Sequence, residues 1–248
     1  FSLSNYKEDP FKLYEKLRDN NPAPFSCFLS FKDDAGSVYI LSNSPERFLK
    51  LTKDNKVETK PIKGSARRSE NYLIDKDIKD KLLNSLKDRA ENIMIVDLMR
   101  NDLSRVCTPD SIKVPALCML ESYAGVHHLV SKVTGRLDKN KDAVDLLKAT
   151  FPGGSITGAP KIQAMQVINE IENTGRGPYC GSMGYIGFDG SMDISIGIRT
   201  VIMGGASNLS VQAGGAITAS SDALSEYQES LDKINKILRT IIPQEEIA

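Results

Sequence analysis

Short turns join most of the strand-like segments of this chain, and these connections restrict its fold more than any other feature. Residues 25–31 and 37–42 alternate as strands do and are separated by the turn DDAG, which predicts a hairpin. Further strands are expected at residues 111–121, 126–137, 181–189, 192–203 and 209–215. Because strands joined by tight turns pair antiparallel, we predict an α+β fold. It should consist of mostly antiparallel β-sheets packed together and covered by outer α-helices.

Apolar residues at three-and-four spacing predict the covering helices. Asp9 followed by Pro10 is typical of a helix start, and this helix is expected to end before Asn21-Pro22. One long helix is expected over residues 75–106. Shorter helices are expected at residues 142–150, 159–172 and 222–242.

Composition limits the functional class. Lysine plus arginine equals aspartate plus glutamate at 32 each, so nothing indicates a surface for nucleic acid. No apolar run is long enough to span a bilayer, and the four scattered cysteines, without a CxxC pair, fit reduced thiols. We expect a cytoplasmic protein with no nucleic-acid or membrane partner.

The 248 residues contain no internal repeat and no low-complexity linker. A single intertwined domain, residues 1–248, is therefore the simplest expectation. The chain opens with FSLSN, which lacks an initiator methionine and reads like the middle of a strand. We expect that this domain lacks its N-terminal part.

Two pairs of carboxylates stand three residues apart within predicted helices. Asp88 and Glu91 form one pair, and Glu226 and Glu229 form the other. Residues at i and i+3 share a helix face, so each helix can present two carboxylates together. If the two faces meet, their oxygens could hold one Mg²⁺. The alternative is two solvated helix faces.

The stretch PIKGSARR holds Lys63 between a proline that fixes one backbone dihedral and a glycine that frees another. This combination predicts a shaped turn. Lys63 then either points into a site or is a solvated loop lysine.

The loop FPGGSITGAPK, residues 151–161, is not a nucleotide P-loop. Two of its glycines have the P-loop spacing, but Ala159 and Pro160 follow where lysine and a hydroxyl residue are required. The loop could bind a carboxylate through backbone amides and the hydroxyls of Ser155 and Thr157. It could equally be a structural connection.

Two further features have open interpretations. The paired Gly214 and Gly215 fit either a close approach of backbone to ligand or a tight bend. His127 and His128 are adjacent in a predicted strand, so their side chains should point to opposite faces. One of them is a candidate acid–base group, or both are structural.

In their order along the chain, these stretches resemble the chorismate-utilising enzymes, and within that family the aminodeoxychorismate synthases. The matching segments are SPERF (44–48), PIKGSARR (61–68), KDRAENIMIVDLMRNDLSRVC (87–107), ESYAGVHHLVS (121–131), FPGGSITGAPKIQAM (151–165), CGSMGYIGFDGSMDISIGIRT (180–200), QAGGAIT (212–218) and SEYQESLDKINKIL (225–238). One departure is PIKGS in place of the usual PIKGT, which keeps a hydroxyl at residue 65.

The resemblance implies a Mg²⁺ site and a set of substrate ligands. Glu91 and Glu229 would bind the metal, with Asp88 and Glu226 holding its waters, and the metal would hold the ring carboxylate of chorismate. The implied substrate ligands are Arg199 and Tyr185 with the backbone of Gly214 and Gly215 for the enolpyruvyl carboxylate, Ser155 near the ring and Lys233 near the metal-bound carboxylate.

The lysine of PIKG distinguishes aminodeoxychorismate synthases from other branches of the family. The resemblance implies that neutral Lys63 attacks carbon 2 of chorismate while Glu46 assists departure of the hydroxyl at carbon 4, with His128 as a further catalytic residue. Ammonia would then add at carbon 4 and expel the lysine, giving 4-amino-4-deoxychorismate for 4-aminobenzoate and folate biosynthesis. Lys60 is a candidate cationic neighbour that would favour the neutral amine.

No glutamine-amidotransferase signature occurs in the sequence. A separate subunit or fused domain is therefore expected to supply ammonia from glutamine. Two alternatives stay open: an anthranilate synthase component I, which would aminate carbon 2 and eliminate pyruvate, and a non-catalytic chorismate-binding regulatory subunit.

Overall fold

A computed structural model describes residues 1–34, 36–123, 125–204, 208–219 and 221–242. Contacts between residues divide the chain into two compact units. Unit 1 comprises Phe1–Pro45, Gly175–Met183 and Ser195–Ala248, and unit 2 comprises Glu46–Thr174 and Gly184–Ile194. The expectation of a single domain remains a prediction.

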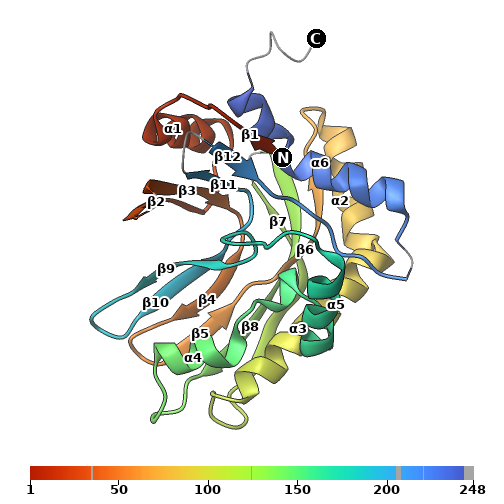
Figure 1. Cartoon of the computed structure of the whole chain (residues 1–248). Coiled ribbons are helices and arrows are strands. Elements are labelled where there is room, and N and C mark those ends of the chain that lie inside the picture. The colour runs from red at the N-terminus through yellow and green to blue at the C-terminus, as the bar shows by residue number, and fades with distance from the viewer. Residues whose placement is uncertain (35, 124, 205–207, 220, 243–248) are drawn as a thin grey trace. The chain divides into compact units, whose positions relative to one another are not determined.

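Unit 1 is built on a five-stranded antiparallel sheet in the order β1-β12-β11-β3-β2 (Figure 1). Its strands are β1 Ser2–Leu3, β2 Phe25–Asp33, β3 Gly36–Ser44, β11 Thr200–Gly204 and β12 Asn208–Val211. Helices α1 (Pro10–Asn20) and α6 (Ala223–Ile241) share one apolar core with this sheet. The predicted hairpin is confirmed as β2–β3; Ala35 of its turn lies outside the described residues.

Capping at both ends explains α1. The Asp9 carboxylate accepts hydrogen bonds from two backbone amides of the first turn, as expected of an N-cap. At the other end, the buried side-chain amide of Asn43 donates to the carbonyl oxygens of Leu17 and Asn21, at 2.7 and 3.1 Å. The predicted helix is confirmed, and its last turn is tied to β3.

Unit 2 contains most of a seven-stranded sheet in the order β6-β8-β5-β4-β10-β9, with β7 paired to β8. The strands of this sheet are β4 Arg47–Leu51, β5 Lys56–Thr59, β6 Ile62–Arg67, β7 Lys113–Ser122, β8 Val126–Arg136, β9 Ser182–Ile186 and β10 Met192–Ile196. The helices of unit 2 are α2 Tyr72–Asn84, α3 Leu86–Ser104, α4 Ala143–Thr150, the 3₁₀ turn η1 Gly154–Ile156 and α5 Lys161–Ile171. Helix α3 packs along β8 and β6 (Figure 1). Because β8 pairs antiparallel with β5, β6 and β7, the predicted α+β class with antiparallel sheets is confirmed.

The single helix predicted over residues 75–106 is wrong, because the chain divides it into α2 and α3 at Ser85. Ser85 is extended, with φ −63° and ψ 108°. Its hydroxyl accepts a hydrogen bond from the amide of Asp88 at 3.3 Å and so starts a second helix. Apolar residues keep helical spacing on both sides of the break, so periodicity alone does not reveal it. Within the described ranges, no helix is both long and apolar enough to cross a membrane.

Two predicted strands are also wrong in extent. The strand expected over residues 192–203 is two strands, β10 and β11, which belong to different sheets. Between them the chain turns at Arg199, whose φ is 51°. The strand expected at 209–215 ends at Val211, so both glycines of its GG pair lie beyond it.

Strands β4, β5 and β6 were not among the expected elements, because charged residues interrupt their alternation. These charges pair across the sheet. The Arg47 guanidinium lies 3.0 Å from both Asp193 and Glu58, and Lys132 lies 2.5 Å from Glu58. Opposite charges on neighbouring strands stabilise the pairing without an apolar face that a sequence pattern could reveal.

His127 of β8 connects the sheet to α2. Its Nε2 lies 2.9 Å from Asp75 Oδ1, and its Nδ1 lies 2.8 Å from Ser122 Oγ. Burial opposes ionisation of Asp75, but hydrogen bonds from His127, the Ser69 amide and Arg68 hold the pKa of this carboxyl well below its usual range. Since an ionised carboxylate only accepts hydrogen bonds, Nε2 of His127 carries the proton.

Replacing Asp75 with Asn should lower the Tm near neutral pH. It should also make the Tm less dependent on pH in the acidic range. A carboxyl whose pKa is lowered by folding contributes stability that is fully present above its unfolded pKa, about 4, and is lost as pH falls through the folded pKa. The Tm gap between wild type and Asp75→Asn, followed by calorimetry, should therefore narrow below about pH 4. Asp77→Asn is the matched control, because Asp77 pairs with Lys81 on the exposed surface of the same helix. A gap that stays constant with pH would contradict the role assigned to Asp75.

Candidate functional site

The predicted site residues divide between the two units. Unit 2 carries Glu46, Lys63, Asp88, Glu91, His128, Ser155 and Tyr185, and unit 1 carries Arg199, Gly214, Gly215, Glu226, Glu229 and Lys233. The contacts inside each unit determine how its own residues are held.

Lys63 lies on β6, so the turn predicted from its flanking proline and glycine is wrong. Strand β6 pairs with β8 on both sides of an irregularity between Ile62 and Ser65. The three steps between these two residues lie opposite two steps on β8, so one extra residue forms a β-bulge. A bulge changes the direction in which a side chain points, and the half-buried Lys63 lies within it.

Gly64 places this bulge directly against α3. Its φ of +83° lies in the left-handed region, which glycine adopts readily. A Cβ on Gly64 would lie 2.9 Å from the Cβ of Asp88. Glu91 follows on the same helix, three residues on, and is half-buried. The strand of Lys63 thus packs on the helix that carries the first predicted carboxylate pair.

Glu46 is buried just before β4. Its Oε1 lies 3.5 Å from the amide nitrogen of Ile62, so the carboxylate lies beside the residue that precedes Lys63. The next residue, Arg47, contacts Asp193 through two nitrogens at 3.0 Å each. This bidentate pair fixes the start of β4 and with it the position of Glu46.

His128 is buried and contacts β6, whereas His127 contacts α2. The Nδ1 of His128 lies 2.7 Å from Ser65 Oγ. Its ring is tilted against Tyr123, with ring centroids 5.8 Å apart. The two adjacent histidines therefore have different partners, as the alternation of strand side chains predicts.

A charged pair stands next to His128. Glu121 lies opposite His128 in the β7–β8 ladder and accepts hydrogen bonds from Lys60 at 2.6 Å and from the Tyr123 hydroxyl at 3.0 Å. Burial opposes ionisation, but these hydrogen bonds hold the pKa of Glu121 below its usual range. Because Glu121 compensates the charge of Lys60, the structure gives no support to Lys60 as a cationic neighbour of Lys63.

Ser155 lies in η1, within the loop that joins α4 to α5. The neighbouring Gly154 packs against α3, where a Cβ would lie 2.9 Å from Leu98 Cδ2. The Thr157 hydroxyl donates to the carbonyl of Gly153 at 2.9 Å. That hydroxyl is engaged inside the loop, which favours the structural alternative for Thr157.

The two residues predicted to hold the enolpyruvyl carboxylate differ in exposure. The Tyr185 side chain, on β9, is 64 % exposed. Arg199 is half-buried, and its carbonyl oxygen accepts a hydrogen bond from the backbone amide of Asn43 at 3.1 Å. Burial lowers the pKa of Arg199. Among the described residues of its own unit, no acid contributes to this shift, so a carboxylate ligand would supply its counter-charge.

Gly215 faces the carboxylates of α6. A Cβ at this position would lie 2.9 Å from Glu226 Oε2, 3.7 Å from Glu229 Oε1 and 3.8 Å from Lys233 Nζ. Only glycine lets these side chains approach the backbone so closely. Glu226 is buried and accepts a hydrogen bond from the Ser221 hydroxyl at 2.6 Å. Glu226 and Glu229 therefore share one face of α6, as their spacing predicts.

Lys233 joins the same group of residues. Its Nζ lies 2.7 Å from Glu229 Oε1 and donates a hydrogen bond to the carbonyl of Gly214 at 2.9 Å. The structure thus brings together five predicted residues of unit 1: both glycines, both glutamates and this lysine.

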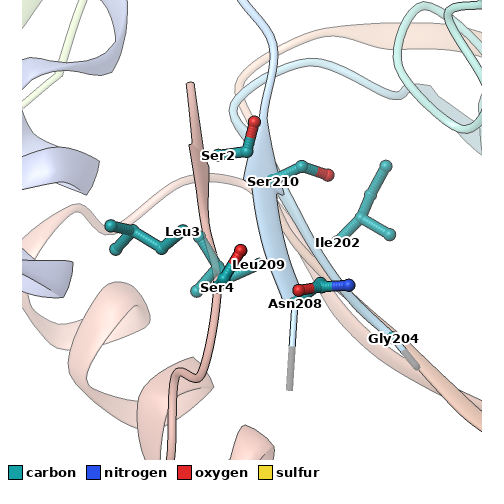
Figure 2. A pocket seen from close by; sticks show the side chains of 8 residues that line it. All are labelled: Ser2, Leu3, Ser4, Ile202, Gly204, Asn208, Leu209 and Ser210. Atoms are coloured by element: carbon teal, nitrogen blue, oxygen red, sulfur yellow. The ribbon is translucent and has the colours of Figure 1, made fainter. Parts of the chain in front are cut away.

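A separate pocket of about 500 Å³ opens in unit 1 between β1, β11 and β12. Figure 2 shows Ser2, Ser4, Asn208 and Ser210 around it, with Ile202. None of the predicted site residues lines this pocket, and its described lining contains no charged side chain. It does not offer the counter-charge that a dicarboxylate substrate needs.

Sequence comparison identifies the family. The profile of the chorismate binding enzymes matches residues 1–239. This chain belongs to that family. Aminodeoxychorismate synthase component 1 of Salmonella typhimurium is 50% identical over 238 residues, which cover 96% of this chain and 51% of that protein. Anthranilate synthase component 1 of Synechocystis sp. is 44% identical over 244 residues, which cover 95% of this chain and 47% of that protein.

The fold of this chorismate binding enzyme matches solved structures as well. The crystal structure of anthranilate synthase component I from Streptococcus pneumoniae aligns with a TM-score of 0.84 at 38% identity, covering 98% of this chain and 51% of that one. The chain spans about half the length of the Salmonella and Synechocystis proteins.

The carboxylate pairs of this chorismate binding enzyme have the donor chemistry that Mg²⁺ requires. Mg²⁺ is usually held by one or two carboxylates and completes its shell with water and substrate oxygens. Glu226 and Glu229 turn oxygens toward the backbone at Gly215. Among the described residues, no three His, Cys, Asp or Glu side chains gather into a metal-binding group. Each pair taken alone therefore fits a magnesium ion that depends on few protein ligands and on water.

The sequence pattern does not reveal two neighbours of His128 in this enzyme, Ser65 and Glu121. The departure at residue 65 predicts only that a hydroxyl is kept there. A strand paired with residues 126–131 would have suggested both as cross-strand neighbours. The bulge in β6 shifts the register, however, so the partner of His128 cannot be counted along the sequence.

Replacing Gly64 with Ala should destabilise the fold. The left-handed backbone alone costs an alanine about 1–2 kcal/mol, and the close contact with Asp88 adds to this cost. Gly190→Ala is the matched control, because Gly190 also has a left-handed φ (+80°) and a Cβ there would meet nothing within 4 Å. The free energy of unfolding in urea should fall more for Gly64→Ala than for Gly190→Ala. Equal losses would show that the contact with Asp88 is unimportant.

Proposed function

We propose that this chain is the chorismate-binding catalytic part of an aminodeoxychorismate synthase. It would aminate chorismate at carbon 4 with ammonia, giving 4-amino-4-deoxychorismate for 4-aminobenzoate and folate biosynthesis, in the cytoplasm. The observation that carries the proposal is the position of Lys63. It lies in a bulge that packs on α3 at Asp88, and Glu46 borders the same strand at Ile62. The 50% identity to a component 1 of aminodeoxychorismate synthase supports the same assignment.

In the proposed reaction, Lys63 and Glu46 act on opposite parts of one displacement. The neutral amine of Lys63 bonds to carbon 2, the ring double bond shifts, and the hydroxyl at carbon 4 leaves as water with a proton from Glu46. Ammonia then bonds to carbon 4, the double bond returns, and the lysine leaves carbon 2 as a neutral amine with the bonding electron pair. One proton of the added ammonia returns to Glu46. His128 is the proposed acid–base group of the same strand pair, held through Nδ1 by Ser65.

Substrate carboxylates would meet the cationic and open positions of the site. Arg199, with the backbone of Gly214 and Gly215 and the hydroxyl of Tyr185, is proposed for the enolpyruvyl carboxylate. Lys233 and Ser155 are proposed for the ring carboxylate and the ring. The desolvated guanidinium of Arg199 supports this role, because a buried cation is stabilised by an ionic partner.

Mg²⁺ is the proposed cofactor. When bound, it would neutralise the ring carboxylate of chorismate and fix its position. Glu91 and Glu229 are the proposed direct ligands, and Asp88 and Glu226 are proposed to hold water. Gly215 supports this role, since its missing side chain lets oxygens of Glu226 and Glu229 lie together beside the backbone.

The ammonia would come from glutamine through an amidotransferase partner. The name "component 1" of the Salmonella relative implies a second component for that protein. The same kind of partner, as a subunit or fused domain, is proposed here.

Anthranilate synthase component I is the second candidate. The Synechocystis protein of that name is 44% identical to this chain, so overall similarity separates the two activities only weakly. The product decides between them, because the second activity releases fluorescent anthranilate and pyruvate.

The test is to incubate the protein with chorismate, Mg²⁺ and ammonium and to identify products by mass spectrometry. Wild type should form 4-amino-4-deoxychorismate, and Lys63→Ala should reduce turnover by roughly 100-fold or more, because it removes the nucleophile. Lys56→Ala is the control, because Lys56 is exposed on β5 of the same sheet. Unchanged turnover in Lys63→Ala would refute the nucleophile role, and anthranilate as the wild-type product would refute the assigned reaction.

A further inference from the structure

The loop that carries Ser155 is closed by one buried ammonium group. Lys161, the first residue of α5, donates from Nζ to the carbonyl oxygen of Thr150 at 2.7 Å and to Asp102 Oδ2 at 2.5 Å. The Lys161 and Asp102 side chains are 13% and 4% exposed. We propose that Lys161 is a positioning residue that closes this loop on α3 and thereby sets the place of Ser155 at the substrate ring. This inference rests on the function proposed above.

The hydrogen bond to Thr150 joins the two ends of the loop. Thr150 is the last residue of α4 and Lys161 is the first of α5, with residues 151–160 between them. A loop whose ends are held together is compact. The adjacent carbonyl of Ala149 accepts a further hydrogen bond from Arg105 at 3.3 Å, so the entry to the loop is also held from the end of α3.

The ion pair with Asp102 holds the closed loop against α3. Asp102 lies near the C-terminal end of α3, the helix that also carries Asp88 and Glu91. Within the loop, Gly154 packs against Leu98 of the same helix. The loop is therefore held to α3 in its middle and at its closing point, and Ser155 is the residue that follows the middle contact.

The energetics favour a positioning role over a stabilising one. Burial raises the pKa of Asp102, although Lys161 and Arg105 act to lower it. A buried ion pair of this kind generally contributes little net stability, and apolar residues of similar volume often replace it without loss. What distinguishes this pair is its geometry, because one ammonium group contacts a carboxylate on α3 and a carbonyl on α4 at the same time.

The variants separate position from stability. Lys161→Met leaves Asp102 buried with its principal partner removed and should destabilise the protein. The double variant Lys161→Met with Asp102→Leu removes both charges and should regain most of the lost stability. It should still show a raised KM for chorismate and a kcat/KM lowered roughly 10- to 100-fold, because the loop has lost its closure. Lys148→Met, at an exposed lysine of α4, is the control and should behave as wild type.

Two measurements decide the proposal. Hydrogen exchange of residues 151–160 should accelerate in the double variant and not in Lys148→Met, and this readout needs no activity. In a cycle with Ser155→Ala, the loss of kcat/KM caused by the double variant should shrink, because both changes affect one residue. Unchanged exchange, or fully additive losses, would overturn the proposal. Failure of the wild type to aminate chorismate would instead overturn the proposed function. The exchange measurement would then still decide whether Lys161 closes the loop, because it needs no activity.

Discussion

The close contact between the backbone of Gly64 and the side chain of Asp88 fixes β6 against α3, and the arrangement of unit 2 follows that helix. Farther along α3, Asn92 donates to the carbonyl of Leu129 at 3.1 Å and so holds β8, the strand of His128. Leu98 meets Gly154, and Asp102 meets Lys161. From Asp88 to Asp102 the helix rises about 21 Å. The same rigid helix thus holds three separate chain segments, which carry Lys63, His128 and Ser155.

Unit 1 meets a different requirement, which is to keep charges available. Gly215 lets the two glutamates of α6 approach the backbone closely, and Lys233 pairs with Glu229 while it donates to the carbonyl of Gly214. Arg199 is held in a left-handed backbone conformation that is costly for a residue with a side chain. Such strain at a desolvated cation is typical of positions where local stability is given up for binding. Each unit thus holds one predicted carboxylate pair, Asp88 and Glu91 in unit 2 and Glu226 and Glu229 in unit 1.

The sequence predicted most helices and hairpins, because capping residues and short turns are local signals. Asp9 and Pro10 define the start of α1 with two residues, and the spacing of Glu226 and Glu229 is enough to put them on one face. It could not reveal the break at Ser85, where the apolar spacing continues across the cap. It missed β4 to β6, whose polar residues are satisfied by partners such as Asp193, far away in sequence. The bulge at Lys63 was hidden for the same reason, since a register shift is a property of two paired strands.

The order of the two units along the chain has a consequence for synthesis. Unit 2 lies entirely between the first and last segments of unit 1. The hydroxyls of Ser42 and Thr200, 2.8 Å apart on β3 and β11, are separated by 158 residues. At ribosomal rates of about 5–20 residues per second, β3 waits roughly 10–30 s for its second neighbour. During that time the β2–β3 hairpin has an unpaired edge, and an isolated hairpin is only marginally stable. Unit 2 can be complete before β11 emerges, so the part that carries Lys63 is ready to fold first, and unit 1 closes only when the last segment of the chain arrives.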